Sequence, residues 1–359
     1  MSIRRLGGSD GSEMRADRWR SRLGSVLPVM SIILVLLGGC AGTRLVVDVV
    51  PARSELDETV VEEDEGGGWR GPDAKVAMID MTGVIADQQR FAIPGPGVNP
   101  VALFFESLDK AAEDDDVKAV LLRINSRGGT VTASHIVYRE LVRFREETGK
   151  PVVVLMGDVA ASGGYYLACG SDHIVAHPMT VTGSIGVIMR TFDASEGMRR
   201  IGIRSNAIVS GPNKNLASPF DPMSPEQREI LQAMIDQMYG EFSAVVLQAR
   251  PMLRSKEMEW VRDGRVVTGA RALELGLVDE IGDVHDAFDA AKELAGVQAA
   301  KLVKYHRPVE YVGSAYGRAP AAPSAGDRTE INLLQIELGD AGAMADESGF
   351  YYLWDPMAW

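Results

Sequence analysis

The chain has 359 residues, 46% of them hydrophobic and 24% charged, which is ordinary for a globular protein of one or two domains. Its net charge of −13 argues against nucleic acid as a partner, because phosphate binding needs a basic face. Only two cysteines occur, Cys40 and Cys169, so neither a disulfide framework nor a cysteine metal site follows. We expect no cofactor and no metal.

The N-terminus has the pattern of an export signal. Four arginines between Arg15 and Arg22 precede the apolar run 23–39, and Leu-Gly-Gly-Cys ends at Cys40. Seventeen residues separate Arg22 from Cys40, fewer than the roughly 20 of a membrane span. Leucine, two small residues and cysteine resemble the bacterial lipobox, in which the cysteine is lipidated and becomes the new N-terminus. Residues 1–39 are therefore predicted to be a lipoprotein-type signal peptide; the alternative is an uncleaved signal anchor. Both place the body membrane-anchored on the extracytoplasmic (periplasmic) side.

Composition divides the rest of the chain. Residues 40–74 are acidic and end in glycines, which predicts a tether or peripheral segment that is solvated rather than metal-binding. The compact domain is expected over 75–310. An Ala/Pro/Gly linker, 311–328, then leads to the apolar tail 329–359, which is apolar enough to dock back on the body but suggests no function of its own.

Strand and helix patterns alternate from Lys75 onward. Apolar strand patterns cover 75–85, 117–125, 151–156, 173–177 and 183–189. Helical patterns occupy 100–113 and 162–170, the stretch 126–149 is a Gly-rich corner that leads into an amphipathic helix, and a longer helix begins near 225. This alternation predicts right-handed βαβ units, a parallel sheet and an α/β fold with a helical C-terminal part.

The helix ends carry specific signals. Asn99 followed by Pro100 is a good N-cap and first-turn proline. The helix that ends before Gly149 is expected to bury Ile136, Val137, Leu141 and Phe144. Ser224, with Pro225 and Gln227 after it, predicts a capping box at the start of the long helix.

Two Gly-Gly corners, 128–129 and 163–164, each follow a strand and open a helix. In a parallel sheet both corners lie at the carboxyl ends of strands, where sites form. Converging N–H groups there would make an oxyanion hole beside the single hydroxyl of Ser162. A serine nucleophile needs a base, and none of the five histidines lies in such a corner.

Five motifs in series resemble the signal peptide peptidase A (protease IV) family in its short form, with one catalytic unit per chain. The resemblance covers roughly residues 75–305, and its motifs are RINSRGGTVTAS, DVAASGGYYLACGSD, TVTGSIGVI, VSGPNKNLASPF and DGRVVTGARALELGLVDEIG. It implies a crotonase/Clp-like fold and a serine peptidase with a Ser/Lys dyad. Ser162 matches the nucleophile and Lys214 the general base, 52 positions later.

Other residues match supporting roles of that family. Gly129 and Gly163 match the oxyanion-hole amides, and Ser184 matches a serine that hydrogen-bonds the lysine. Arg127 stands where the family usually has proline, which puts the preorganisation of the oxyanion hole in question. His135 and Cys169 are expected to be structural.

The resemblance implies an endopeptidase that degrades signal-peptide remnants and other hydrophobic or unfolded peptides, assembled as a homo-oligomeric ring. Three alternatives share parts of the pattern. A Clp-type protease would need a histidine base, which TGSIGVI lacks. An enoyl-CoA hydratase uses acidic residues and normally has no lipobox. A non-catalytic lipidated scaffold would not need Ser162 and Lys214.

Overall fold

The computed structural model describes residues 55–64, 72–88, 99–254, 256–307, 314–315 and 350–354. The signal segment, Cys40 and the linker lie outside the described residues, apart from Ser314 and Ala315 of the linker. Within the described parts no helix is both long and apolar enough to cross a bilayer.

Nine of the described strands form one sheet, in the order β1-β11-β2-β3-β5-β6-β10, with β7 beside β5 and β9 beside β7. The pairs from β11 through β10 are parallel, whereas β1 and β9 pair antiparallel with their neighbours. The strands are β1 (Asp57–Glu63), β2 (Lys75–Thr82), β3 (Val117–Ser126), β5 (Val152–Ala161), β6 (His173–Ala176), β7 (Val181–Gly183), β9 (Val266–Thr268), β10 (Glu280–Ile281) and β11 (Lys301–His306).

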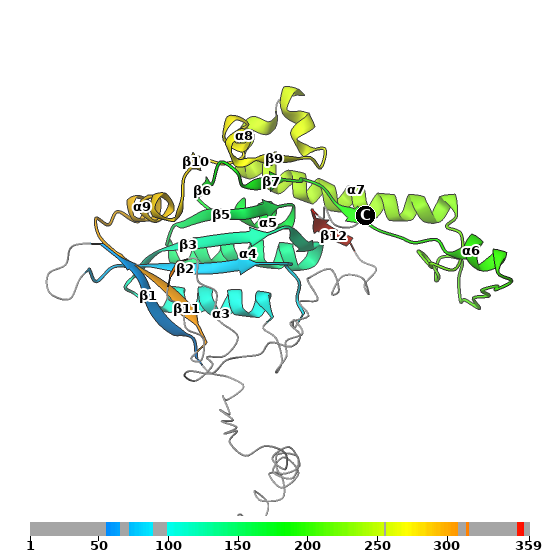
Figure 1. Ribbon diagram of the computed structural model, residues 1–359, viewed down its shortest axis with the longest axis horizontal. Helices are drawn as coiled ribbons and strands as arrows, with labels where there is room; N and C mark the ends of the chain where they lie inside the picture. Colours follow the sequence, from blue (N-terminus) through cyan, green and yellow to red (C-terminus); the bar gives the residue numbers. More distant parts are fainter. Residues whose placement is uncertain are drawn as a thin grey trace, which may run out of the picture. The chain divides into compact units, whose positions relative to one another are not determined.

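Helices cover both faces of this sheet (Figure 1). Alternation along β2 sends Ala77 and Ile79 into the core shared with α3 and α4, and Val76 and Met78 into the core under α9. The helices are α3 (Pro100–Glu113), α4 (Val131–Thr148), α5 (Gly163–Ala168), α6 (Ser195–Arg200), α7 (Pro225–Ala249), α8 (Gly269–Glu274) and α9 (Val284–Ala295), with 3-10 turns at Pro251–Arg254 and Lys256–Arg262. The predicted α/β class with βαβ units and a parallel sheet is confirmed.

The predicted helix caps are confirmed, but one residue predicted to be buried on α4 is not. The Asn99 side chain accepts hydrogen bonds at the start of α3, Gly149 ends α4 in the left-handed region, and Ser224 forms the capping box of α7. Ile136, however, is exposed, because the buried stripe of α4 runs through other positions: Ala133, Ser134, Val137, Leu141 and Phe144.

The predicted strand 183–189 is wrong in its middle. It is divided into β7 and β8 (Ile188–Met189). Ser184 has a positive φ of 53° and donates its N–H to the Arg265 carbonyl, which turns the chain out of the ladder. β8 instead joins a second sheet of three described strands, together with β4 (Gly128–Thr130) and β12 (Phe350–Leu353).

The acidic segment 40–74, expected to be a tether, contributes an edge strand. β1 pairs antiparallel with β11, so the sheet begins at Asp57 rather than near Lys75. The strand was not predicted because its acidic residues suggested a solvated segment, whereas in the fold such residues are paired with lysines that are distant in sequence. Three such ion pairs are Glu58 with Lys75, Asp64 with Lys292, and Glu63 with Lys301.

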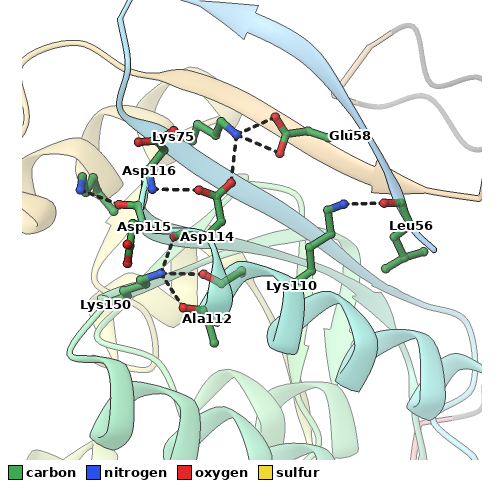
Figure 2. A network of polar contacts seen from close by, with 11 residues as sticks. Leu56, Glu58, Lys75, Lys110, Ala112, Asp114, Asp115, Asp116 and Lys150 are labelled. Atoms are coloured by element: carbon green, nitrogen blue, oxygen red, sulfur yellow. Dashed lines mark hydrogen bonds and ion pairs between the residues drawn. The ribbon is translucent and has the colours of Figure 1, made fainter.

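A polar network ties β1 to the start of β2 and the end of α3 (Figure 2). Lys75 Nζ lies 3.0 Å from Glu58 and 2.9 Å from Asp114. Lys150 Nζ donates to three carbonyls at the C-terminus of α3, those of Ala111, Ala112 and Asp114. Burial alone would raise the pKa of the Asp114 carboxyl, but the hydrogen bonds from Lys75 and from the Asp116 N–H, together with the charges of Lys75 and Lys150, outweigh burial and hold that pKa below 3.8.

We predict that Asp114→Asn lowers the free energy of unfolding at pH 7 by about 1–3 kcal/mol, because a charge-assisted hydrogen bond is lost. Because the pKa of Asp114 is lower in the folded state, its carboxylate stabilises the fold at pH values above its unfolded pKa of 3.8. This contribution is lost as the pH falls through the folded pKa. The difference from wild type in denaturant unfolding should therefore shrink progressively as the pH is lowered below 3.8. Asp115→Asn, at the exposed neighbouring carboxylate, is the control; an equal loss there would contradict the assignment.

Candidate active site

Ser162 lies where β5 ends and α5 begins. Its φ of 55° and ψ of −117° are unusual for a residue with a side chain, and backbone strain of this kind is concentrated at functional sites. The side chain does not cap α5. Its Oγ is buried and has no hydrogen-bond partner among the described residues. The fold therefore holds a strained serine whose hydroxyl is left available.

The two Gly-Gly corners meet beside Ser162, as predicted. A Cβ at Gly128, where φ is +103°, would lie 2.8 Å from the Gly163 nitrogen. A Cβ at Gly163 would lie 2.5 Å from Ser134 Oγ and 3.1 Å from the Gly128 Cα. Parallel pairing brings the corners together, because β3 and β5 are neighbours with Ser126 opposite Ala160. Only glycine permits this approach of two backbones.

The N–H of Gly129 points toward the strand β12. Ile85 donates to the Gly128 carbonyl and accepts from the Thr130 N–H, at 2.9 and 3.0 Å. In a parallel pairing of this kind the intervening residue directs its own N–H and C=O to the opposite side of the strand. That side faces β12, where Tyr352 lies opposite Gly129. The Gly129 N–H thus points toward β12, and the role of the Gly129 and Gly163 amides as an oxyanion hole stays a prediction.

Ser184 is also brought to this position. The Ser162 N–H donates to the Gly183 carbonyl at 2.8 Å, which fixes the corner after β7 beside the nucleophile candidate. Ser184 is buried and has a positive φ. Its supporting role stays a prediction.

Lys214 is not brought to Ser162. Its side chain is exposed, and its N–H bonds only to Gly211 in a local turn. The surrounding segment, 191–224, is almost entirely exposed, with apolar side chains at Phe192, Ile201 and Ile208 facing solvent. Hydrogen bonds in this segment close on itself or on Gln227 at the start of α7. Four of the five predicted site residues in the domain therefore converge, and the base does not.

None of the histidines replaces the lysine. All five lie in the described parts of the chain, and each imidazole is bonded elsewhere. The pairs are His135 with the Tyr166 hydroxyl, His173 with Glu280, His177 with the Met179 N–H, His285 with Glu62, and His306 with Thr59. The structural role expected for His135 is confirmed. A Clp-type histidine base is not present among these residues.

Sequence reasoning missed the contribution of β12. This short strand inserts between β4 and β8 and ends beside Arg127, whose carbonyl accepts the Trp354 N–H at 2.8 Å. Figure 1 shows β12 next to α5 and α7. The only signal in the sequence was the apolar character of the tail, which does not specify a partner strand.

A cavity of about 540 Å³ lies on another part of the body, lined by Cys169 among others. Its main charges neutralise one another in two ion pairs, Arg145 with Asp172 and Arg250 with Asp279. Burial raises the pKa of the Cys169 thiol to about 12, so this cysteine is inert, as expected. Across the described residues, no group of His, Cys, Asp or Glu is arranged to hold a metal ion.

We predict that Gly163→Ala destabilises the fold by about 1–3 kcal/mol, because the added methyl overlaps Ser134 Oγ. Ser134 Oγ is buried without a partner among the described residues, so Ser134→Ala alone should change stability little. In the double variant the overlap disappears and at least half of the loss should return. Urea unfolding of the four proteins measures the coupling, and strictly additive effects would refute the contact.

Comparison with known proteins identifies the chain. Residues 145–298 match the model of peptidase family S49. A Synechocystis sp. protein named as a protease is 40% identical over 64% of this chain and 77% of its own length. An Enterococcus faecium protein named signal peptide peptidase SppA is 32% identical over 78% and 81%, and the chloroplastic serine protease SPPA of Arabidopsis thaliana is 32% identical over 79% and 42%. The chain therefore belongs to the signal peptide peptidase A family, and it is a serine peptidase.

Proposed function

We propose that this chain is a membrane-tethered endopeptidase in which Ser162 is the nucleophile and Lys214 the general base. The observation that carries the proposal is the strained Ser162 beside two converging glycine corners, with a hydroxyl that has no hydrogen-bond partner among the described residues. The Ser162 Oγ would attack a peptide carbonyl, whose developing oxyanion would be held by the Gly129 and Gly163 N–H groups. The lysine would take the serine proton and give it to the leaving amine, and water would then release the acyl group.

The base is supplied, on this proposal, by a second copy of the chain in a homo-oligomer. Ser162 Oγ has no partner within the described part of its own chain. Lys214 is carried on the exposed segment 191–224, whose apolar side chains Phe192, Ile201 and Ile208 would be buried by a neighbour. Covering such a surface is a common reason for association. Ser184, beside Ser162, would hydrogen-bond the incoming lysine, whose amine must be neutral to accept the serine proton.

We predict that Ser162→Ala and Lys214→Ala are each inactive alone but recover activity when co-assembled. In a random one-to-one mixture about a quarter of the interfaces join an intact serine to an intact lysine, so about 25% of wild-type turnover should return. Peptidase assays on refolded or co-expressed mixtures measure this. Fluorophosphonate labelling of Ser162 in the wild type tests the nucleophile independently.

The control is a mixture of Ser162→Ala with the double variant in which both Ser162 and Lys214 are replaced by alanine. This mixture contains no intact serine and should stay inactive. Activity in Ser162→Ala alone would eliminate the nucleophile. A mixture that never rises above its parents, while wild type is labelled at Ser162, would show that the lysine acts within its own chain. Lys214→Arg should be as damaging as Lys214→Ala, because a guanidinium does not give up its proton.

The substrates we propose are signal-peptide remnants and other hydrophobic or unfolded peptides at the outer side of a membrane. Two observations support this. The protein named signal peptide peptidase SppA in Enterococcus faecium matches most of the chain, and Cys40 follows an apolar run in a lipobox-like context. A lipid on Cys40 would hold the peptidase where such peptides are released.

We predict that Cys40→Ser blocks lipidation and retains residues 1–39. Mass spectrometry of the membrane-extracted protein should find wild type beginning at a lipidated Cys40. The non-lipid control is Cys169→Ser, which leaves the N-terminus unaltered. A wild-type chain that still begins at Met1 and has an unmodified Cys40 would establish the signal anchor instead.

A further inference from the structure

A tight turn before β9, made of Asp263, Gly264 and Arg265 (the 263–265 turn), lies against the corner that holds Ser184. At the end of the ladder between β7 and β9, the Arg265 carbonyl accepts the Ser184 N–H at 2.7 Å. Two residues further along the chain, a Cβ at Gly186 would lie 3.5 Å from the Gly264 Cα. The turn therefore contacts the chain at Ser184 and again just after it.

One carboxylate closes this turn. Asp263 Oδ1 accepts the Arg265 backbone N–H at 3.1 Å and Arg265 Nε at 2.8 Å, and Oδ2 accepts a second guanidinium N–H at 2.5 Å. Gly264 between them has a φ of +91°, a conformation that suits glycine. The hydrogen bond from the Arg265 side chain is the main cause that holds the pKa of the Asp263 carboxyl below its usual value of 3.8, so the carboxylate is charged at neutral pH.

Two aromatic residues fasten the turn to the body of the protein. The Arg265 guanidinium lies over the Trp260 ring, 4.4 Å from its centroid, in a cation–π contact. Trp260 in turn packs against the main hydrophobic core. On the other side, the Tyr239 hydroxyl of α7 donates to the Arg262 carbonyl at 2.7 Å. The Arg265 carbonyl therefore has a fixed position, because the turn does not move without breaking these contacts.

Ser184 depends on a fixed acceptor of this kind. Its φ of 53° lies in the left-handed region, which residues with a side chain rarely adopt. The approach is close, since a Cβ at the preceding Gly183 would lie 3.0 Å from the Arg265 oxygen. The Gly183 carbonyl also accepts the Ser162 N–H. A shift of the Arg265 carbonyl would therefore move Ser184 relative to Ser162.

We propose that Asp263 is a positioning residue of the active site, which holds Ser184 in place through the Arg265 carbonyl. The proposal rests on the proposed function, in which Ser184 hydrogen-bonds Lys214 beside Ser162. Asp263 itself is exposed, and its side chain bonds to Arg265 rather than to a reacting group. A small misplacement of a catalytic group lowers the rate strongly, whereas an exposed ion pair contributes little to folding. Loss of Asp263 should therefore affect the reaction far more than the stability of the fold.

In the full-length protein, Asp263→Ala should lower kcat for a fluorogenic hydrophobic peptide about tenfold, with little change in KM or Tm. The rate of fluorophosphonate labelling at Ser162 should fall by a similar factor. Asp263→Asn keeps an acceptor for the Arg265 N–H and should lose less than about threefold. The matched control is Glu274→Ala, which breaks a comparably exposed ion pair with Arg271 on α8 and should leave kcat within about twofold.

A double-mutant cycle tests whether the effect passes through Ser184. If it does, Asp263→Ala should cost less than about twofold in kcat when Ser184→Ala is already present. Amide hydrogen exchange of residues 182–187, measured by mass spectrometry, reports the same contact without catalysis. Asp263→Ala should accelerate this exchange at least about fivefold, because the Ser184 N–H loses its fixed acceptor. Arg265→Ala, which releases the turn from the guanidinium side, serves if Asp263→Ala does not fold; it should give the same changes to a smaller extent.

Three results would each overturn the proposal: unchanged kcat in a folded Asp263→Ala protein, unchanged exchange of residues 182–187, or an undiminished loss of kcat on the Ser184→Ala background. Failure of the proposed function looks different. Fluorophosphonate would then leave Ser162 unlabelled in the wild type and the peptide uncleaved, while the exchange measurement would still decide whether the turn holds Ser184.

Discussion

The site depends on one contact, the approach of two backbone corners that have no room for side chains. Gly128 and Gly163 are so close that a Cβ on either would meet the other's main chain or a neighbour. Three strands and one bridging residue converge on this contact. β3 and β5 deliver the two corners, Ile85 donates to the Gly128 carbonyl, and the Gly183 carbonyl at the end of β7 accepts from the Ser162 N–H. A main chain packed this closely gives the amide groups fixed directions, which electrostatic stabilisation of an oxyanion requires.

The cost of this arrangement is met by the core around it. Ser162 has a backbone conformation that ordinary residues avoid, and its hydroxyl is buried without a partner in the described structure. Both features are unfavourable by amounts on the order of 1–3 kcal/mol each. They persist because β5 is buried on both faces over its first half and α5 is buried throughout. The strain is thereby localised at Ser162, the residue whose hydroxyl is the proposed nucleophile.

Much of this was accessible from the sequence, for physical reasons that differ by element. Local signals predicted the caps at Asn99 and Ser224, because a cap needs only neighbouring residues. Parallel βαβ spacing predicted that the two glycine corners meet. The edge strand β1 and the tail strand β12 were not predicted, because their partner strands are distant in sequence and their patterns are short. The position of Lys214 relative to Ser162 could not be predicted either. A separation of 52 residues in sequence does not determine a distance in space when the lysine lies in an exposed segment.

The proposed function places one catalytic group outside the parallel sheet. On that proposal the sheet would supply the nucleophile and the two amides in rigid form, whereas the base would come from the exposed segment around Lys214. A single chain would then have a serine without a base, so hydrolysis would require assembly, which brings the lysine of a second copy. Such a division of the dyad would keep chains inactive until they associate.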